Sequence, residues 1–164
     1  MPDPSGGSIS RDSEGKASGL LSEAAAVMMV WPHIAQVSPM EEKINALRAG
    51  FKAYSAAGYT GVVEMAMDEN GWEALQFLRQ QDGKLSVRLA AHWLIAPSNT
   101  EEGNLKQVDR AIELHKHFNT ETSPDCRIAG IKVICDGVID ACTAALLEPD
   151  RKSTRLNSSH QYYL

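Results

Sequence analysis

Four side chains with useful chemistry occur in or directly after short runs of β-forming residues: Glu64, His92, Lys132 and Asp136. Carboxylates and imidazoles act as general acids, general bases and metal ligands, and an uncharged lysine amine is a nucleophile. The four residues lie far apart along the chain, so they can form one site only if the fold brings them together. The elements around them therefore decide what they can do.

Helical and strand-like stretches alternate along most of the chain. Apolar residues recur at helical spacing over residues 38–58, 71–81 and 105–118, and β-rich runs cover residues 59–65, 87–95 and 128–136. This order predicts an α/β fold in which a parallel sheet is built from βα units. Because a parallel strand needs cover on both faces, three strands alone are expected to be part of something larger.

Details of two helices follow from the sequence. Ser38 can cap the first helix, with Pro39 at its first position and Glu41 three residues after the cap. In the third helix Ile112 and His115 are spaced to lie on one face with Val108.

Alternation within each strand assigns its side chains to two faces. In the third strand the apolar set is Ile131, Val133 and Cys135, and the other set is Gly130, Lys132, Ile134 and Asp136. The same count separates His92 from Trp93, and Glu64 from Val63, Met65 and Met67. The apolar sets suit the side covered by helices, so we expect Glu64, His92 and Lys132 to point to the opposite, inner face.

Each of these side chains also has a simpler interpretation. Lys132 can be a strand-end lysine that pairs with Asp136 or reaches solvent, and Asp136 can simply begin a turn at Asp136-Gly137. His92 can be a packed or hydrogen-bonded histidine, and Glu64 can pair locally. In their functional roles, Glu64, His92 and Asp136 line a substrate pocket and Lys132 is a metal ligand.

Composition narrows the class of protein. The chain has 164 residues, 43% hydrophobic and 23% charged, with a net charge of −5, and it has no broad basic patch, so nucleic acid is not an expected partner. The longest apolar stretch, residues 20–31, is interrupted by Ser22 and Glu23 and is too short to span a membrane. The N-terminus lacks a signal-peptide pattern. The sequence carries no signal for oligomeric state.

The three cysteines match no zinc or redox motif. The number of cysteines is odd, and no two of them have CxxC spacing; they are Cys126, Cys135 and Cys142. Reduced thiols in a cytoplasmic protein are the expected state.

Three parts follow along the chain. Residues 1–37 are expected to form a loop or hairpin with a short helical lead-in, and residues 38–149 the α/β part. Residues 150–164 have no apolar period, and their start, DRKSTRLNSSH, reads like a translated sequencing adapter. We expect this tail to be an artefact.

Several stretches together resemble one enzyme family. They are DPSGGSISRDSEGKASGLL at 3–21, AGYTGV at 57–62, GIKVICDG at 130–137 and TAALLEP at 143–149. In order and spacing they resemble the type 3 amidohydrolases of the amidohydrolase superfamily, over nearly all of residues 3–149. The resemblance implies a (β/α)₈ barrel, of which this chain would hold about strands 2–4 with their helices.

The resemblance also implies a metal-dependent hydrolase. Its metal site would draw on a His-x-His pair, a strand-4 lysine, two later histidines and an aspartate, and Lys132 matches the lysine. A carbamate on that lysine could bridge divalent metals such as Zn²⁺, and a metal-bound hydroxide would attack an amide, cyclic amide or related carbonyl of a small-molecule substrate. The other ligands would lie outside residues 1–149, so we expect an internal fragment that is inactive alone.

One motif resembles a metal-binding pair but is not expected to bind metal. His115-Lys116-His117 has the His-x-His spelling, but residues two apart on a helix point in different directions, so we expect an ordinary helix surface. The alternative class is a non-enzymatic α/β binding or interaction module. A Rossmann module is disfavoured because no G-x-G-x-x-G follows any strand.

Overall fold

The computed structural model describes residues 1–4, 6–139 and 144–145. The chain divides into two compact units: Met1–Val37 with Ile134–Leu164, and Ser38–Val133. The second unit starts at Ser38, the residue at which the sequence places the start of the α/β part. The described residues from Ile134 onward group with the first unit.

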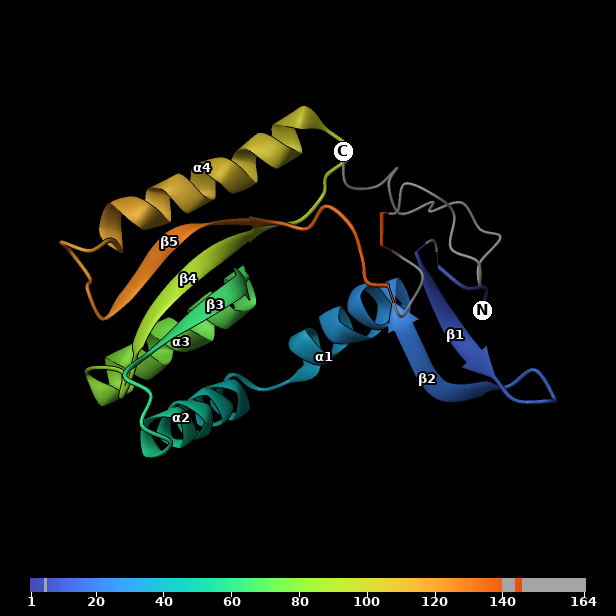
Figure 1. Ribbon diagram of the computed structural model, residues 1–164, viewed down its shortest axis with the longest axis horizontal. Helices are drawn as coiled ribbons and strands as arrows, with labels where there is room; N and C mark the ends of the chain where they lie inside the picture. The colour runs from blue at the N-terminus through green and yellow to red at the C-terminus, as the bar shows by residue number, and fades with distance from the viewer. Residues whose placement is uncertain (5, 140–143, 146–164) are drawn as a thin grey trace. The chain divides into compact units, whose positions relative to one another are not determined.

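The first unit opens with a β-hairpin. Strands β1 (Gly7–Arg11) and β2 (Ala17–Glu23) are antiparallel (Figure 1). In the turn between them, Asp12 Oδ1 accepts the backbone N–H groups of Glu14 and Lys16, both at 2.9 Å. Gly15 has φ 79°, a left-handed conformation that costs glycine little. A carboxylate and a glycine therefore fix the hairpin predicted for this end.

Two short helices follow the hairpin. The π-helix η1 (Ala25–Val30) leads into α1 (Trp31–Val37). Together they take up most of the apolar stretch noted at residues 20–31. Among the described residues, no helix combines the length and apolar character needed to cross a membrane.

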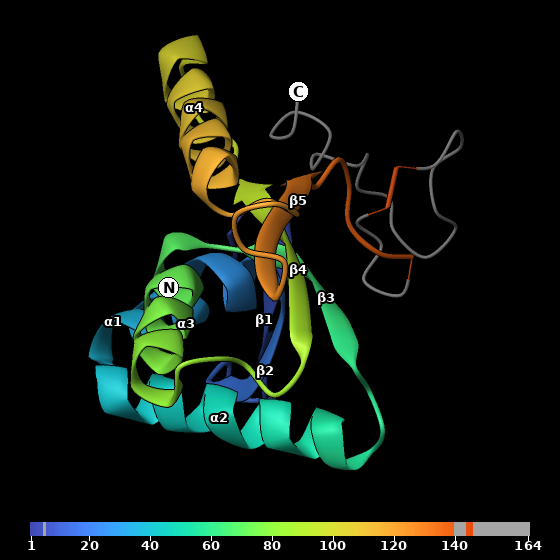
Figure 2. The same ribbon diagram turned by 90° about the vertical axis from the view of Figure 1, so that its left-hand side faces the viewer.

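The second unit alternates helices and parallel strands, as predicted. Its order is α2 (Met40–Ala56), β3 (Gly61–Met67), α3 (Glu69–Asp82), β4 (Arg88–Ile95), α4 (Glu101–His117) and β5 (Cys126–Val133). The strands form one parallel sheet in the order β3-β4-β5 (Figure 1). The predicted fold class, α/β with part of a (β/α)₈ barrel, is confirmed. Figure 2 shows α3 and α2, which pack against each other, in the same unit as the sheet.

The helix starts depend on local capping. Helix α2 begins at Met40 after Pro39, and no side chain caps it, so the prediction that Ser38 is the cap was wrong by one residue. The Pro39 carbonyl instead accepts the N–H of Lys43. Helix α3 is capped by Asp68, whose Oδ1 accepts the N–H of Gly71 at 2.7 Å.

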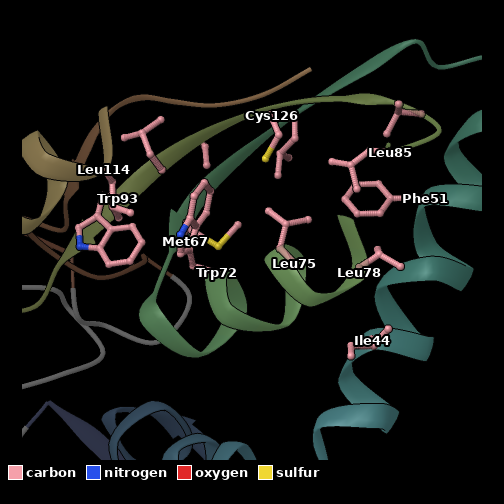
Figure 3. Close-up of a cluster of buried hydrophobic side chains, with 14 of the residues drawn as sticks. Ile44, Phe51, Met67, Trp72, Leu75, Leu78, Leu85, Trp93, Leu114 and Cys126 are labelled. Atoms are coloured by element: carbon pink, nitrogen blue, oxygen red, sulfur yellow. The ribbon is translucent and has the colours of Figure 1, made fainter. Parts of the chain in front are cut away.

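The hydrophobic core lies on one side of the sheet. On β4 the buried residues alternate, and they pack with side chains of all three helices (Figure 3). Trp72 meets the rings of Phe118 and Trp93 edge-on, with centroids 4.8 Å and 6.4 Å apart. The core consists of Ile44, Phe51, Met67, Trp72, Leu75, Leu78, Leu85, Val87, Leu89, Ala91, Trp93, Ala111, Leu114, Cys126 and Ile128.

The face that α4 buries differs from the predicted one. Ala111 and Leu114 are buried, whereas Ile112 is 49% exposed. The predicted stripe of Val108, Ile112 and His115 is therefore not the face that α4 buries in the core. Ala111, which the predicted stripe omits, belongs to the core instead.

Candidate functional site

The register of β4 and β5 brings two of the four candidate residues to one face. His92 pairs with Gly130, and Lys132 pairs with Leu94. Paired residues of neighbouring strands point to the same face, and alternate residues share it. His92, Leu94, Gly130 and Lys132 thus lie on the face opposite the core, which contains their alternates Ala91 and Trp93.

A β-bulge makes this arrangement possible. Ala91 pairs with Ile128, but the next residue, His92, pairs with Gly130, so Ala129 is an extra residue in β5. Cys126 and Ile128 face the core, and uninterrupted alternation would carry Lys132 to the core side as well. The bulge reverses the alternation. The predicted separation of Gly130 and Lys132 from Ile131 and Val133 therefore agrees with the register.

The ring of His92 lies against the backbone of Gly130. A Cβ atom at position 130 would come 3.2 Å from Cδ2 and 3.6 Å from Nε2 of His92. The residue is half-buried, and its Nδ1 is buried without a hydrogen-bond partner among the described residues. A buried polar nitrogen without a partner is costly, so it marks a position where a ligand or water would be stabilising.

Lys132 is half-buried on the same face. Among the described residues its ammonium group makes neither an ion pair nor a hydrogen bond. Leu94 is its cross-strand neighbour, and Gly130, two residues earlier, adds no side chain between Lys132 and His92. The local arrangement is thus an amine and an imidazole on adjoining strands, separated by small or apolar neighbours.

Glu64 does not join this face, so its predicted position was wrong. It pairs with Ala91, a core-side residue, whereas Val63 pairs with Ala90 on the open face. The register then shifts between Glu64 and Met67, and this second irregularity returns Met67 to the core side. The carboxylate of Glu64 accepts the N–H of Ala66 at 2.8 Å, the local pairing named as its alternative.

Asp136 belongs to the first unit. Its Oδ2 accepts the N–H of Ala145 at 3.0 Å, and the residue is half-buried. The structure has no turn at Asp136-Gly137, so the prediction of a turn there was wrong. The Asp136 carboxylate is thus engaged with the backbone at Ala145.

The described residues do not by themselves fit a metal centre. In the part of the chain that the structure describes, no group of three or more His, Cys, Asp or Glu side chains could hold a metal ion. Lys132 with His92 would supply at most two ligands, short of the four of a typical zinc site. No chemical step through a metal follows from these residues alone.

The sequence missed one residue close to the site. His115 projects from α4, and its Nδ1 lies 2.8 Å from the carbonyl oxygen of Ile128, directly before the bulge. A carbonyl oxygen only accepts, so Nδ1 carries the proton and donates. His115 is thus more than the ordinary helix surface predicted for the His115-Lys116-His117 motif, and its spacing with Val108 and Ile112 was the one sequence signal that it lies on a packed face.

The described cysteines show no feature of a catalytic nucleophile. Burial raises the pKa of the Cys126 thiol to about 11, and the thiol is part of the core. Cys135 is exposed and free. Cys142 lies outside the described residues.

The sequence profile described as Amidohydrolase family matches residues 1–162, nearly the whole chain. The chain belongs to the amidohydrolase family. No curated protein and no solved structure is similar enough to the chain to count as a match. The family match runs into residues 150–162, which lie outside the described residues, and the artefactual origin of that segment stays a prediction. For an amidohydrolase, the parallel βα units of the second unit are the expected part of a barrel.

Proposed function

We propose that this amidohydrolase chain is part of a metal-dependent hydrolase that cleaves amide, cyclic amide or related carbonyl C–N bonds of a small-molecule substrate. Family membership supports hydrolase chemistry. The observation that carries the site is that Lys132 and His92 lie on the same face of the sheet, opposite the core. A cytoplasmic location and zinc as the metal are parts of the same proposal.

Lys132 is proposed as the metal-site lysine of the parent enzyme. A lysine on the uncovered face of a parallel sheet would face the lumen if further strands closed a barrel. A neutral amine there can add carbon dioxide, and the carbamate would supply oxygen ligands to a divalent metal. The remaining ligands must come from outside the described residues, which agrees with the expected inactivity of the chain alone.

His92 is proposed as a substrate-pocket residue. Its unpaired Nδ1 and its place beside the unsubstituted Gly130 support a group that binds or orients a polar part of the substrate. Asp136 stays a predicted pocket residue, although its carboxylate already holds the Ala145 amide. The register gives Glu64 no support for a pocket role on this face.

The test compares the hydrolase activity of the 164-residue chain with that of the parent protein, which is encoded by the reading frame that contains residues 1–149. With zinc and bicarbonate, the 164-residue chain is expected to turn over no amide or ester substrate, and the parent is expected to be active. Lys132→Ala should abolish parent activity, whereas Lys106→Ala, on the exposed surface of α4, should leave it unchanged. Turnover by the short chain, or full activity of the Lys132→Ala parent, would refute the proposal.

The competing binding-module function has less support. Such a module would need both faces of its sheet covered. On the open face, Val63 is 61% exposed, so this face of the second unit lacks cover at β3. A melt of residues 1–149 as cooperative and at as high a temperature as that of the parent would favour the module, and a much lower or broader melt would favour the hydrolase part.

A further inference from the structure

We propose that His115, which lies on α4 outside the candidate site, is a positioning residue: it holds the bulge that keeps Lys132 on the face of His92. The proposal rests on the proposed function only for the role of Lys132. The geometry concerns β5 and its neighbours, and it can be tested without any measurement of hydrolysis.

The end of α4 holds both backbone groups of Ile128. The Nδ1–H of His115 donates to the Ile128 carbonyl oxygen at 2.8 Å, and the Ile128 N–H donates to the carbonyl oxygen of Phe118 at 2.9 Å. Phe118 is the residue that ends α4. The residue immediately before the bulge is therefore fixed to the helix by two hydrogen bonds.

The residue after the extra Ala129 is also constrained. At Gly130 the lack of a Cβ lets the His92 ring lie on the backbone, in contact with the position a side chain would occupy. Ala129 is thus placed between a fixed Ile128 and a close-packed Gly130. Two histidines act at this bulge, His115 through a hydrogen bond on its N-terminal side and His92 by packing on its C-terminal side.

The alternative register shows what this arrangement prevents. If β5 paired with β4 without the bulge, Ala129 would face His92, and Lys132 would pair with Ile95 instead of Leu94. A slip of one residue moves every following side chain to the other face. Lys132 would then point to the helix side of the sheet and Ile131 to the open side. Holding the bulge therefore sets the direction of Lys132, the proposed metal-site lysine.

The experiment uses the full 164-residue chain and nuclear magnetic resonance. In the unchanged chain, long-range ¹⁵N–¹H spectra should place the His115 proton on Nδ1, and a nuclear Overhauser effect should join His92 Hδ2 to Gly130 Hα. In His115→Ala, that effect should weaken, and the amides of residues 129–132 should exchange about fivefold faster, the expected result of losing one hydrogen bond.

Two further variants make the result specific. His117→Ala removes a histidine from the same exposed helix end and should change neither readout. His115→Gln keeps an N–H donor and should recover part of the protection. Unchanged exchange and an unchanged Overhauser effect in His115→Ala would overturn the proposal. So would equal loss of protection across the whole sheet, or unprotected amides at 129–132 in the unchanged chain.

These outcomes are independent of the proposed function. If Lys132 proves dispensable for hydrolysis by the parent, the bulge results still stand as statements about the strand. If the bulge is indifferent to His115, the hydrolase proposal is untouched, because its test depends on Lys132→Ala.

Discussion

The imidazole of His92 occupies space that a side chain at position 130 would need. A Cβ there would lie 3.2 Å from Cδ2, closer than ordinary van der Waals contact. The two residues are directly paired across β4 and β5, so the identity of one limits the position of the other. A glycine at this strand position thus has a local reason that concerns the candidate site.

Gly130→Ala is expected to move the His92 ring by a few tenths of an ångström while leaving the fold intact. The added methyl group must displace the imidazole or the strand, but alanine also lowers the entropy of the unfolded chain. The two effects oppose each other, so the net change in unfolding free energy should be within about 1 kcal/mol. Chemical-shift changes at His92, measured with denaturant unfolding, check this. Unchanged His92 resonances would contradict it.

Gly50→Ala provides the matched control. Gly50 lies inside α2, and a Cβ added there meets nothing within 4 Å. Because glycine is unfavourable in a helix interior, this change should raise the free energy of unfolding by about 0.5–1 kcal/mol. It should leave the His92 resonances in place. A destabilised Gly50→Ala chain would show that α2 is not the regular helix described here.

The sequence predicted the order and the parallel arrangement of the elements, because hydrophobic periods and lengths are local properties. The direction of a side chain was predicted correctly only where the alternation count did not cross a register shift. For Lys132 the count used the residues after the Ala129 bulge, so its face agrees with the structure. For Glu64 the count ran through Met67 across a register shift, and the result was inverted.

Contacts between distant elements were also beyond the sequence. His115 reaches a carbonyl on β5, and Ala111 rather than Ile112 packs on the core. Both depend on how α4 is rotated about its axis, which a period of apolar residues determined only approximately. A bulge reverses the alternation of side-chain direction along a strand, and no local pattern in residues 126–133 predicts one.

Stability is expected to fall at high pH because of Cys126. Burial raises the pKa of this thiol to about 11, above the value of about 8.5 for a free cysteine. The folded state therefore binds the proton more tightly than the unfolded state. This contribution is fully present below about pH 8.5 and is lost as the pH rises toward 11, by an amount on the order of 3 kcal/mol. Urea unfolding at several pH values measures it.

The control for this pH effect is Cys126→Ala. Tyrosines and lysines also titrate in this range, so only the difference between the two chains reports on the thiol. The difference in unfolding free energy should shrink as the pH rises from 8.5 to 11. A constant difference would mean that the thiol ionises normally in the folded chain.

Trp72 should be the most costly aromatic side chain to remove. It is 4% exposed and contacts the rings of Phe118 and Trp93, which joins α3, β4 and the end of α4. Trp72→Ala should lower the free energy of unfolding by about 3–5 kcal/mol, because it leaves a large cavity. Trp31→Ala, at a residue 61% exposed in α1, should cost less than about 0.5 kcal/mol. Similar losses from both variants would contradict the described core.

Arg79 is expected to stabilise the connection between α4 and β5. Its Nη2 donates to Ser123 Oγ and to Asp125 Oδ1, both at 3.1 Å, while the buried Ser123 hydroxyl donates to the Cys126 carbonyl oxygen at 2.7 Å. Arg79→Met keeps the apolar part of the side chain but removes the charge-assisted hydrogen bonds. The loss should be about 1–3 kcal/mol of unfolding free energy.

Lys106→Met is the comparison for Arg79. Among the described residues Lys106 pairs only with Glu102, one turn away, and both side chains are more than 70% exposed. An exposed pair of this kind contributes at most about 0.5 kcal/mol. Denaturant unfolding should therefore show a clearly larger loss of unfolding free energy in Arg79→Met than in Lys106→Met. Amide exchange at residues 123–126 should become faster only in Arg79→Met. If both variants unfold alike, the Arg79 hydrogen bonds do not hold this loop to α3.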